Sequence, residues 1–192
     1  MRLQLLGGVL AALMSALMST PAAAATLYSN NFEGQPKALQ GAGAHTDTLG
    51  YKKLGFQNQM WRNDSSGGGA ADASWLTFTL DVARVVNLSF DLAIIDSWDK
   101  TTNFGPDTFN VAVDGHPVFS RIFTGDFDAF TQPTVDPALT TLSFGSKLAK
   151  YGAWNDDWDD AAYAVSLSLG QLDAGDHIVS FYAAGPVWQG GL

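Results

Sequence analysis

LTFTLDVARVVNLSFDL, residues 76–92, is the segment that decides the fold. In its first part the apolar residues Leu76, Phe78 and Leu80 alternate with threonines, and the residues from Val86 to Leu92 alternate in the same way. A period of two with one apolar face is typical of half-buried antiparallel strands, because successive side chains of a strand point to opposite faces. The segment therefore predicts two half-buried strands of antiparallel sheets.

Other parts of the chain repeat this pattern with less regularity. Asp114-Gly115 predicts a tight turn between two apolar runs, which is a strong hairpin signal. Residues 35–50 predict a loop, and residues 125–145 predict an irregular excursion. The strands expected from alternation and turn signals cover residues 26–29, 55–62, 76–80, 86–92, 109–113, 117–123, 165–169 and 177–184. Seven or eight strands without a helical period predict an all-β fold, a two-sheet antiparallel sandwich of jelly-roll type.

The first 25 residues have the layout of a secretory signal peptide. The positive Arg2 precedes an apolar run from Leu3 to Met18, and the alanines 22–25 form a cleavage site of the A-x-A type. The run is too short and wrongly flanked for a membrane-spanning helix, although an uncleaved anchor is the alternative. The sequence therefore predicts a secreted chain whose residues 26–192 form one β-sandwich domain, with no membrane span.

Composition narrows the classes of partner and of chemistry. Removal of Arg2 changes the net charge from −9 to −10, and so acidic a surface repels phosphate backbones, which argues against nucleic acid as a partner. The absence of cysteine excludes disulfides, thiolate metal sites and cysteine nucleophiles. The acidic residues are 18 aspartates and the single Glu33, in a chain with 20 glycines. Aspartate favours turns and caps, and oxygen ligands on loops are what a hard cation such as calcium requires.

The loop after the run AII, residues 93–95, concentrates three carboxylates and a tryptophan. One hypothesis is that Asp96, Asp99 and Asp107 bind calcium together with backbone carbonyls, because a divalent cation removes the repulsion between close carboxylates. The spacing matches no strong calcium motif. In the alternative, these aspartates cap turns while Trp98 packs over a sheet edge. A catalytic pair of Asp96 and Asp107 is a third interpretation. Glu33 is a further candidate calcium ligand, with a solvated loop glutamate as the alternative.

A second constellation, YGAWNDDWDD, occupies residues 151–160. Aromatic faces stack on the apolar faces of sugar rings, and neighbouring Asp and Asn side chains bind hydroxyl groups. The candidate glycan-binding residues are Trp98, Tyr151, Trp154, Trp158 and Asp159. The alternative is that the tryptophans anchor a long loop onto the sandwich. The three histidines stand in unrelated segments, so the sequence predicts no zinc site and no site that joins them.

Several strings together resemble a known group of proteins. The strings are LSFDL at 88–92, DSWD at 96–99, GPDTF at 105–109, VDG at 113–115, WDD at 158–160 and WQGGL at 188–192. They resemble secreted bacterial β-sandwich proteins of the jelly-roll, galactose-binding-like kind, many of which end in a PEP-CTERM sorting tail. The resemblance covers most of the mature chain and implies an extracellular or cell-envelope location. In such proteins the glycine-rich close continues into an acidic segment and a last strand, so we expect a domain that lacks its C-terminal strand.

Three functions compete on these grounds. The first is a non-catalytic extracellular module that calcium stabilises and that binds glycan, such as an extracellular polysaccharide, or matrix. The second is a carbohydrate-active enzyme on the same scaffold, although a single glutamate precludes the usual Glu pair and leaves only an Asp pair. The third is a purely structural cell-surface protein that assembles through its sheet edges.

Overall fold

The computed structural model describes most of the chain between residues 25 and 185. For residues 53–54, 139–149 and 159–160 it describes the backbone alone. Apart from Ala25, the predicted signal peptide lies outside the described residues. The described residues are 25–34, 36, 38–48, 51–54, 56–63, 69–95, 98, 106–123, 139–149 and 159–185.

The described residues form an all-β structure, as the alternating pattern predicts. Within the described ranges, helix is limited to two short 3₁₀ turns, η1 (Tyr51–Leu54) and η2 (Ala70–Asp72). The strands are β1 (Leu39–Gly41), β2 (Ala44–Asp47), β3 (Gln59–Arg62), β4 (Ser74–Leu80), β5 (Arg84–Ile94), β6 (Thr108–Val113), β7 (His116–Ile122), β8 (Leu139–Ala149), β9 (Asp159–Leu172) and β10 (Gly175–Ala184).

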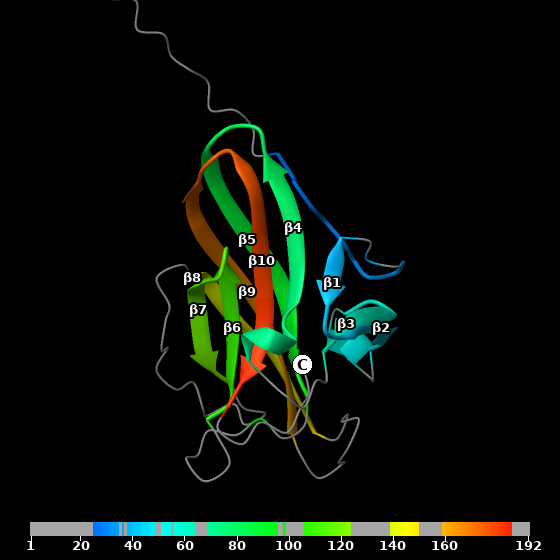
Figure 1. The fold of residues 1–192 in the computed structure, drawn as a ribbon. Coiled ribbons are helices and arrows are strands. Elements are labelled where there is room, and N and C mark those ends of the chain that lie inside the picture. Colours follow the sequence, from blue (N-terminus) through cyan, green and yellow to red (C-terminus); the bar gives the residue numbers. More distant parts are fainter. Residues whose placement is uncertain are drawn as a thin grey trace, which may run out of the picture.

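Two main sheets face each other, and every strand pair in them is antiparallel. One sheet has the order β1-β4-β10-β6-β7 and the other has the order β5-β9-β8, while β2 and β3 form a separate two-stranded sheet. In Figure 1 the strand β10 lies between β4 and β6, with β5 and β9 behind them. The chain changes sheet between β4 and β5, between β5 and β6, between β7 and β8, and between β9 and β10. These crossings, with β10 returning between β4 and β6, give the sandwich its jelly-roll-like character.

The core lies between the two main sheets and uses the apolar face of each alternating strand. Buried residues of β5 and β9, such as Ile94, Val165 and Leu167, pack with Val111 of β6 and Val179 of β10 in one cluster. A fully buried side chain of this size contributes roughly 1.5–3 kcal/mol relative to an exposed one. The core therefore joins the two sheets into one sandwich, which confirms the predicted fold class.

Aromatic side chains fill one part of this core. Phe109, Phe119 and Phe123 pack against one another with ring centroids 6.4–6.5 Å apart. Phe123 also meets Tyr163 of β9 at 4.8 Å in an edge-to-face arrangement, which is a favoured geometry for aromatic rings. Burial raises the pKa of Tyr163 to about 12, so its hydroxyl stays protonated at physiological pH.

A smaller apolar cluster attaches the 51–63 region to the sandwich. Tyr51 is fully buried and packs with Met60, Ile95 and Ala162. The Tyr51 hydroxyl donates a hydrogen bond to the backbone carbonyl of Ile94 at 2.6 Å, where β5 ends. This contact satisfies a backbone acceptor of β5 and fixes the start of the loop that follows it.

The structure also corrects three local predictions. Residues 26–29 form no strand, because β1 takes the edge of β4 instead, with Leu39 opposite Leu76. The expected loop at 35–50 contains β1 and β2. Part of the expected irregular excursion at 125–145 belongs to β8, whose register shifts at two places along β9. Such bulges break the strict alternation by which strands are recognised in a sequence.

Candidate functional site

Asp107 is the member of the predicted calcium trio that the structure describes. It lies immediately before β6 and is only 2% exposed. Its backbone carbonyl accepts a hydrogen bond from the Phe123 N–H at 3.2 Å, and a methyl group added at Gly185 would collide with its Oδ1 atom. The carboxylate is therefore held between the start of β6 and the end of β10. The absence of a side chain at Gly185 is what makes room for it.

The other two members of the trio, Asp96 and Asp99, lie outside the described residues. Within the described part of the chain no group of three or more His, Cys, Asp or Glu side chains is arranged to hold a metal ion. The three-aspartate site thus remains a prediction. Asp107 fits its donor chemistry, because a carboxylate withdrawn from water is stabilised by a nearby cation.

Trp98 belongs to the core. It is 4% exposed and packs in the same apolar cluster as Ile94 and Phe123. A ring so deeply buried offers little of its face to a sugar. This position favours the packing alternative for Trp98, whose role in glycan binding stays a prediction.

Glu33 connects the N-terminal region to the start of β3. Its Oε1 atom accepts the backbone N–H groups of Asn58 at 2.5 Å and Gln59 at 3.3 Å, while Oε2 accepts the Asn58 side-chain amide at 2.6 Å. These hydrogen bonds, chiefly the one from the Asn58 side chain, lower the pKa of Glu33. An exposed carboxylate with these partners stabilises the β3 end locally, and its role as a calcium ligand remains a prediction.

Of the glycan-binding candidates in the second constellation, Tyr151, Trp154 and Trp158 lie outside the described residues. Asp159 is the first residue of β9, and its backbone pairs with that of Ala149 of β8. The proposed binding of sugars by these four residues is therefore still a prediction.

The described residues that flank the two candidate segments meet at one end of the sandwich. Ile94 at the end of β5 pairs with Ala161 near the start of β9, so the end of β5 and the start of β9 lie at the same end of the sheet. At the same end, the lower one in Figure 1, β6 starts and β10 finishes, with Thr108 paired to Ala184. The antiparallel pairing thus brings the anchor points of both segments to one end of the fold.

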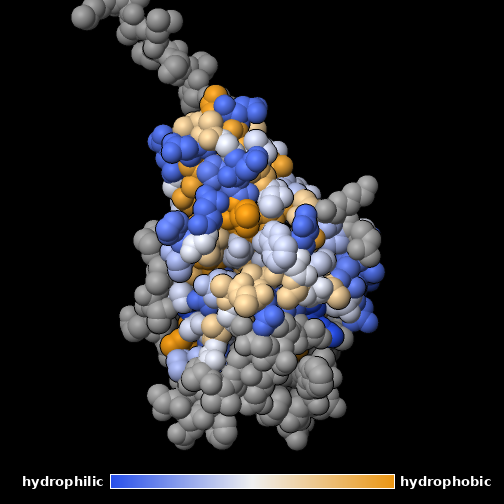
Figure 2. All heavy atoms as spheres, in the orientation of Figure 1, coloured by the Kyte–Doolittle hydropathy of each residue, from blue (hydrophilic) through white to orange (hydrophobic). Residues whose placement is uncertain are grey.

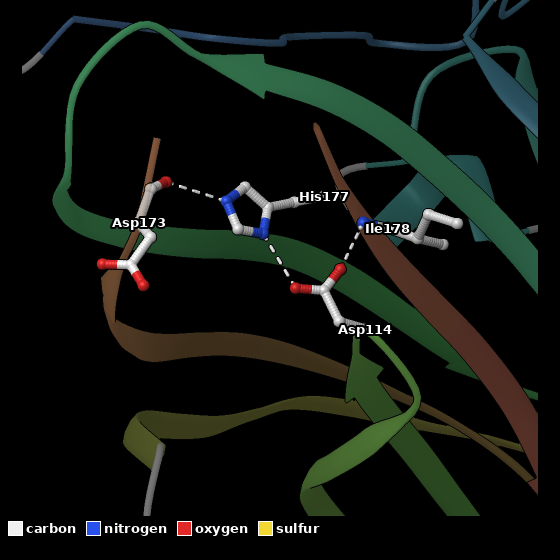
Figure 3. A network of polar contacts seen from close by, with 4 residues as sticks. All are labelled: Asp114, Asp173, His177 and Ile178. Atoms are coloured by element: carbon white, nitrogen blue, oxygen red, sulfur yellow. Dashed lines mark hydrogen bonds and ion pairs between the residues drawn. The ribbon is translucent and has the colours of Figure 1, made fainter. Parts of the chain in front are cut away.

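A polar cluster that the sequence did not predict lies elsewhere, around His177 of β10. Its Nδ1 atom is 2.8 Å from Oδ2 of Asp114, and its Nε2 atom is 2.9 Å from the backbone carbonyl of Asp173 (Figure 3). Asp114 and His177 are 63 positions apart in the sequence, and only the pairing of β6 with β10 brings them together. The contact with Asp173 occupies the ring nitrogen that a hydrolase triad would turn towards its serine.

On the face shown in Figure 2, the apolar residues among those that the structure describes are scattered among polar ones. The large apolar side chains that are exposed include Leu27, Val82, Val85 and Ile178. An open depression of about 440 Å³ is lined by Ser29, Asn30, Asn31 and Gly34. It lacks the apolar walls that are usual in small-molecule sites.

The fold defines the class of the protein as an all-β sandwich with antiparallel sheets. None of the helical segments in the described ranges has the length and apolar character needed to cross a bilayer. Comparisons with known protein families, with characterised proteins and with solved structures find no match for the chain.

Proposed function

We propose that the protein is a secreted, non-catalytic β-sandwich module of the bacterial cell exterior or envelope, related to the PEP-CTERM-associated sandwich proteins. In this proposal calcium stabilises the domain through the loop that contains Asp96, Asp99 and Asp107. The segment from Tyr151 to Asp159 binds glycan, such as an extracellular polysaccharide, or matrix.

The observation that carries the proposal is the burial of the Asp107 carboxylate at the end of an acidic loop. Withdrawal of a carboxylate from water costs free energy, and a divalent cation bound by neighbouring oxygens offsets this cost. The loop also begins and ends on two different strands, β5 and β6, which belong to different sheets. A cation there would tie the two sheets together, which suits a secreted domain that has no disulfides.

The calcium part predicts a shift in thermal stability. Calcium at about 100 times its dissociation constant adds roughly 2.7 kcal/mol, which raises the melting temperature of a domain of this size by about 5–10 °C. The measurement is a melting curve of the purified protein in calcium and in chelator. Asp99→Asn should abolish most of the difference, because it removes a charged ligand.

Asp81→Asn is the matched control. Asp81 is exposed in the turn before β5, at the far end of that strand from the acidic loop, so its neutralisation removes the same charge without touching the loop. Melting curves that coincide in calcium and chelator would exclude calcium stabilisation. Equal responses of the two variants would exclude the loop as the binding site.

The glycan part is tested separately with a glycan array and a panel of labelled polysaccharides. We expect binding without turnover, and we expect Trp158→Ala to lose binding while its melting temperature stays within about 2 °C of the native protein. Loss of folding in Trp158→Ala would instead identify the tryptophan as a loop anchor. Cleavage of a polysaccharide would support the enzyme alternative, and the absence of any glycan signal would support the structural one.

A further inference from the structure

Asp114 extends the pairing of β6 with β10 by one step beyond the end of the strand. β6 finishes at Val113, which lies opposite Val179. The Asp114 N–H then donates to the carbonyl of Ile178 at 2.9 Å, and Oδ1 of Asp114 accepts the N–H of Ile178 at 2.8 Å. The carboxylate thus takes the place of the backbone carbonyl that a longer strand would supply.

The turn conformation aims this carboxylate at β10. Asp114 and Gly115 have φ angles of 51° and 80°, and together they form the two-residue connection between β6 and β7. Positive φ at both central residues is the signature of a type I′ hairpin turn, and aspartate tolerates this conformation better than most residues. Oδ2 of Asp114 is then left to face the His177 ring, as Figure 3 shows.

His177 makes two contacts that both require it to donate. Nδ1 faces the Asp114 carboxylate at 2.8 Å, and Nε2 faces the Asp173 carbonyl at 2.9 Å. The hydrogen bonds from His177 and Ile178 lower the pKa of Asp114, so its carboxylate is ionised at neutral pH and, like the carbonyl oxygen, can only accept. Neutral imidazole has one N–H and satisfies one of these partners, whereas imidazolium satisfies both. The geometry therefore selects the protonated ring.

Burial of the ring disfavours its positive charge, but the hydrogen bonds to Asp114 and to Asp173 outweigh this effect and raise the pKa of His177. The His177 side chain is only 10% exposed, and the Phe78 ring of β4 packs against it with centroids 5.5 Å apart. The charged groups that act on it are Asp114 from the β6–β7 turn and Asp173 from the β9–β10 turn. His116 of β7 also acts on Asp114 and, like His177, lowers the pKa of its carboxyl group.

A further aspartate, Asp176, directly precedes His177 on β10. Its Oδ1 atom accepts the hydroxyl of Thr79 at 2.6 Å, so it is engaged with β4. Asp176 is therefore next to His177 in the sequence, but its carboxylate is hydrogen-bonded to Thr79 of β4.

We propose that His177 is a proton-operated latch that ties the β6–β7 turn to the β9–β10 turn, and that loss of its proton releases the β9–β10 turn. On deprotonation the remaining N–H stays with Asp114, because a hydrogen bond to a charged acceptor is the stronger one. The proton therefore leaves Nε2, and the hydrogen bond to Asp173 is lost. The pairing of Asp114 with Ile178 persists, so the opening is confined to the turn at residues 173–174.

The sign of the pH effect follows from the two partners. The hydrogen bond to Asp114, ahead of that to Asp173, raises the pKa of His177 above 6.5. The stability that His177 contributes is thus fully present below about pH 6.5 and is lost as the pH rises through the raised value. Burial raises the pKa of Asp114, but the hydrogen bonds from His177 and Ile178 outweigh it and lower the pKa below 3.8. Its contribution is lost only as the pH falls through that lowered value.

The latch is tested by an NMR titration of the histidine rings of the purified protein from about pH 5.5 to 9. A His177→Gln variant assigns the signal. We expect the His177 pKa to lie above 6.5 and to fall in Asp114→Asn, and we expect ¹⁵N shifts to show that Nε2 is the nitrogen that loses the proton. The ¹³C shift of the Asp173 carbonyl should change over the same pH range, because this oxygen loses its hydrogen bond from Nε2.

Asp176→Asn is the matched control, because it removes an equal charge one residue from His177 but leaves both ring contacts in place. Its His177 pKa should change less than in Asp114→Asn. Asparagine at position 114 keeps the turn conformation and an amide oxygen for Ile178, so this variant is expected to fold. A His177 pKa at or below 6.5, equal shifts in the two variants, or loss of the proton from Nδ1 would each overturn the latch.

Discussion

The two ends of β6 carry the same chemical group in opposite environments. Asp107 precedes the strand and is 2% exposed, whereas Asp114 follows it with a side chain that is 42% exposed. Asp107 lies against Gly185, while Asp114 bonds to the backbone of Ile178 and to the His177 ring. One strand thus begins at a buried carboxylate that packs against Gly185 and ends at a half-exposed carboxylate that bonds to a neighbouring strand.

The comparison teaches that a residue in an inconspicuous turn can make contacts that its local sequence does not indicate. The acidic loop drew attention to Asp107 because several carboxylates stand close together in the sequence. Asp114 read as an ordinary turn residue, and the turn prediction was confirmed. Its second role depends on a strand that follows some 60 residues later, and no local pattern announces such a partner.

The largest expected effect is a loss of stability from a substitution in the acidic loop that leads to Asp107 and β6. Trp98→Ala should destabilise the protein by about 3–5 kcal/mol, because it removes a large buried side chain and leaves a cavity. Denaturant unfolding measures the loss, and Trp98→Phe should recover part of it by keeping an aromatic ring. A loss below about 1 kcal/mol, together with weaker glycan binding, would show that Trp98 serves a ligand and does not support the core.

Smaller effects are expected from alanine substitutions of the two glycines that lie beside Asp107 and Asp114. Gly185→Ala should cost about 1–3 kcal/mol, because the new methyl group collides with the Asp107 carboxylate. Gly115→Ala meets no atom within 4 Å and should cost about 1–2 kcal/mol from its left-handed backbone alone.

Double-mutant cycles distinguish these two causes. Combination with Asp107→Ala should relieve part of the cost at Gly185, because the colliding oxygen is gone, and should simply add to the cost at Gly115. Additive effects at both glycines would mean that Asp107 does not pack against Gly185.

The strands with clean alternation were predictable, and those without it were not. β4, β6 and β7 appear within one or two residues of their predicted bounds, because each buries one face in the core. β5 and β9 extend further than predicted, by up to six residues at the start of β9, since small residues such as Ala161 and Ala162 pack without an alternating signal. β1 and β2 are short and are positioned by pairing with β4 and β3. The Trp61 side chain of β3 also donates to the carbonyl of Ala42, which lies between β1 and β2 in the chain.

The candidate site was likewise predictable in part from the sequence. The sequence identified acidic and aromatic segments, and the strand pairing brings their anchor points to one end of the sandwich. For Trp98 the sequence left two alternatives, stacking on a sugar and packing over a sheet edge, and its burial in the core favours packing. Burial of a single residue in a loop depends on what the rest of the chain packs over it, and the local sequence carries no record of that.

The sequence by itself determined that this chain forms antiparallel strands with tight turns, because side-chain alternation and turn chemistry act over a few residues. Only the tertiary structure decided which strands are neighbours, that Asp107 is buried, and that Asp114 meets His177. Those outcomes depend on contacts between segments far apart in the chain. Such contacts form where two strands can bury their apolar faces and pair their backbone hydrogen-bonding groups at the same time.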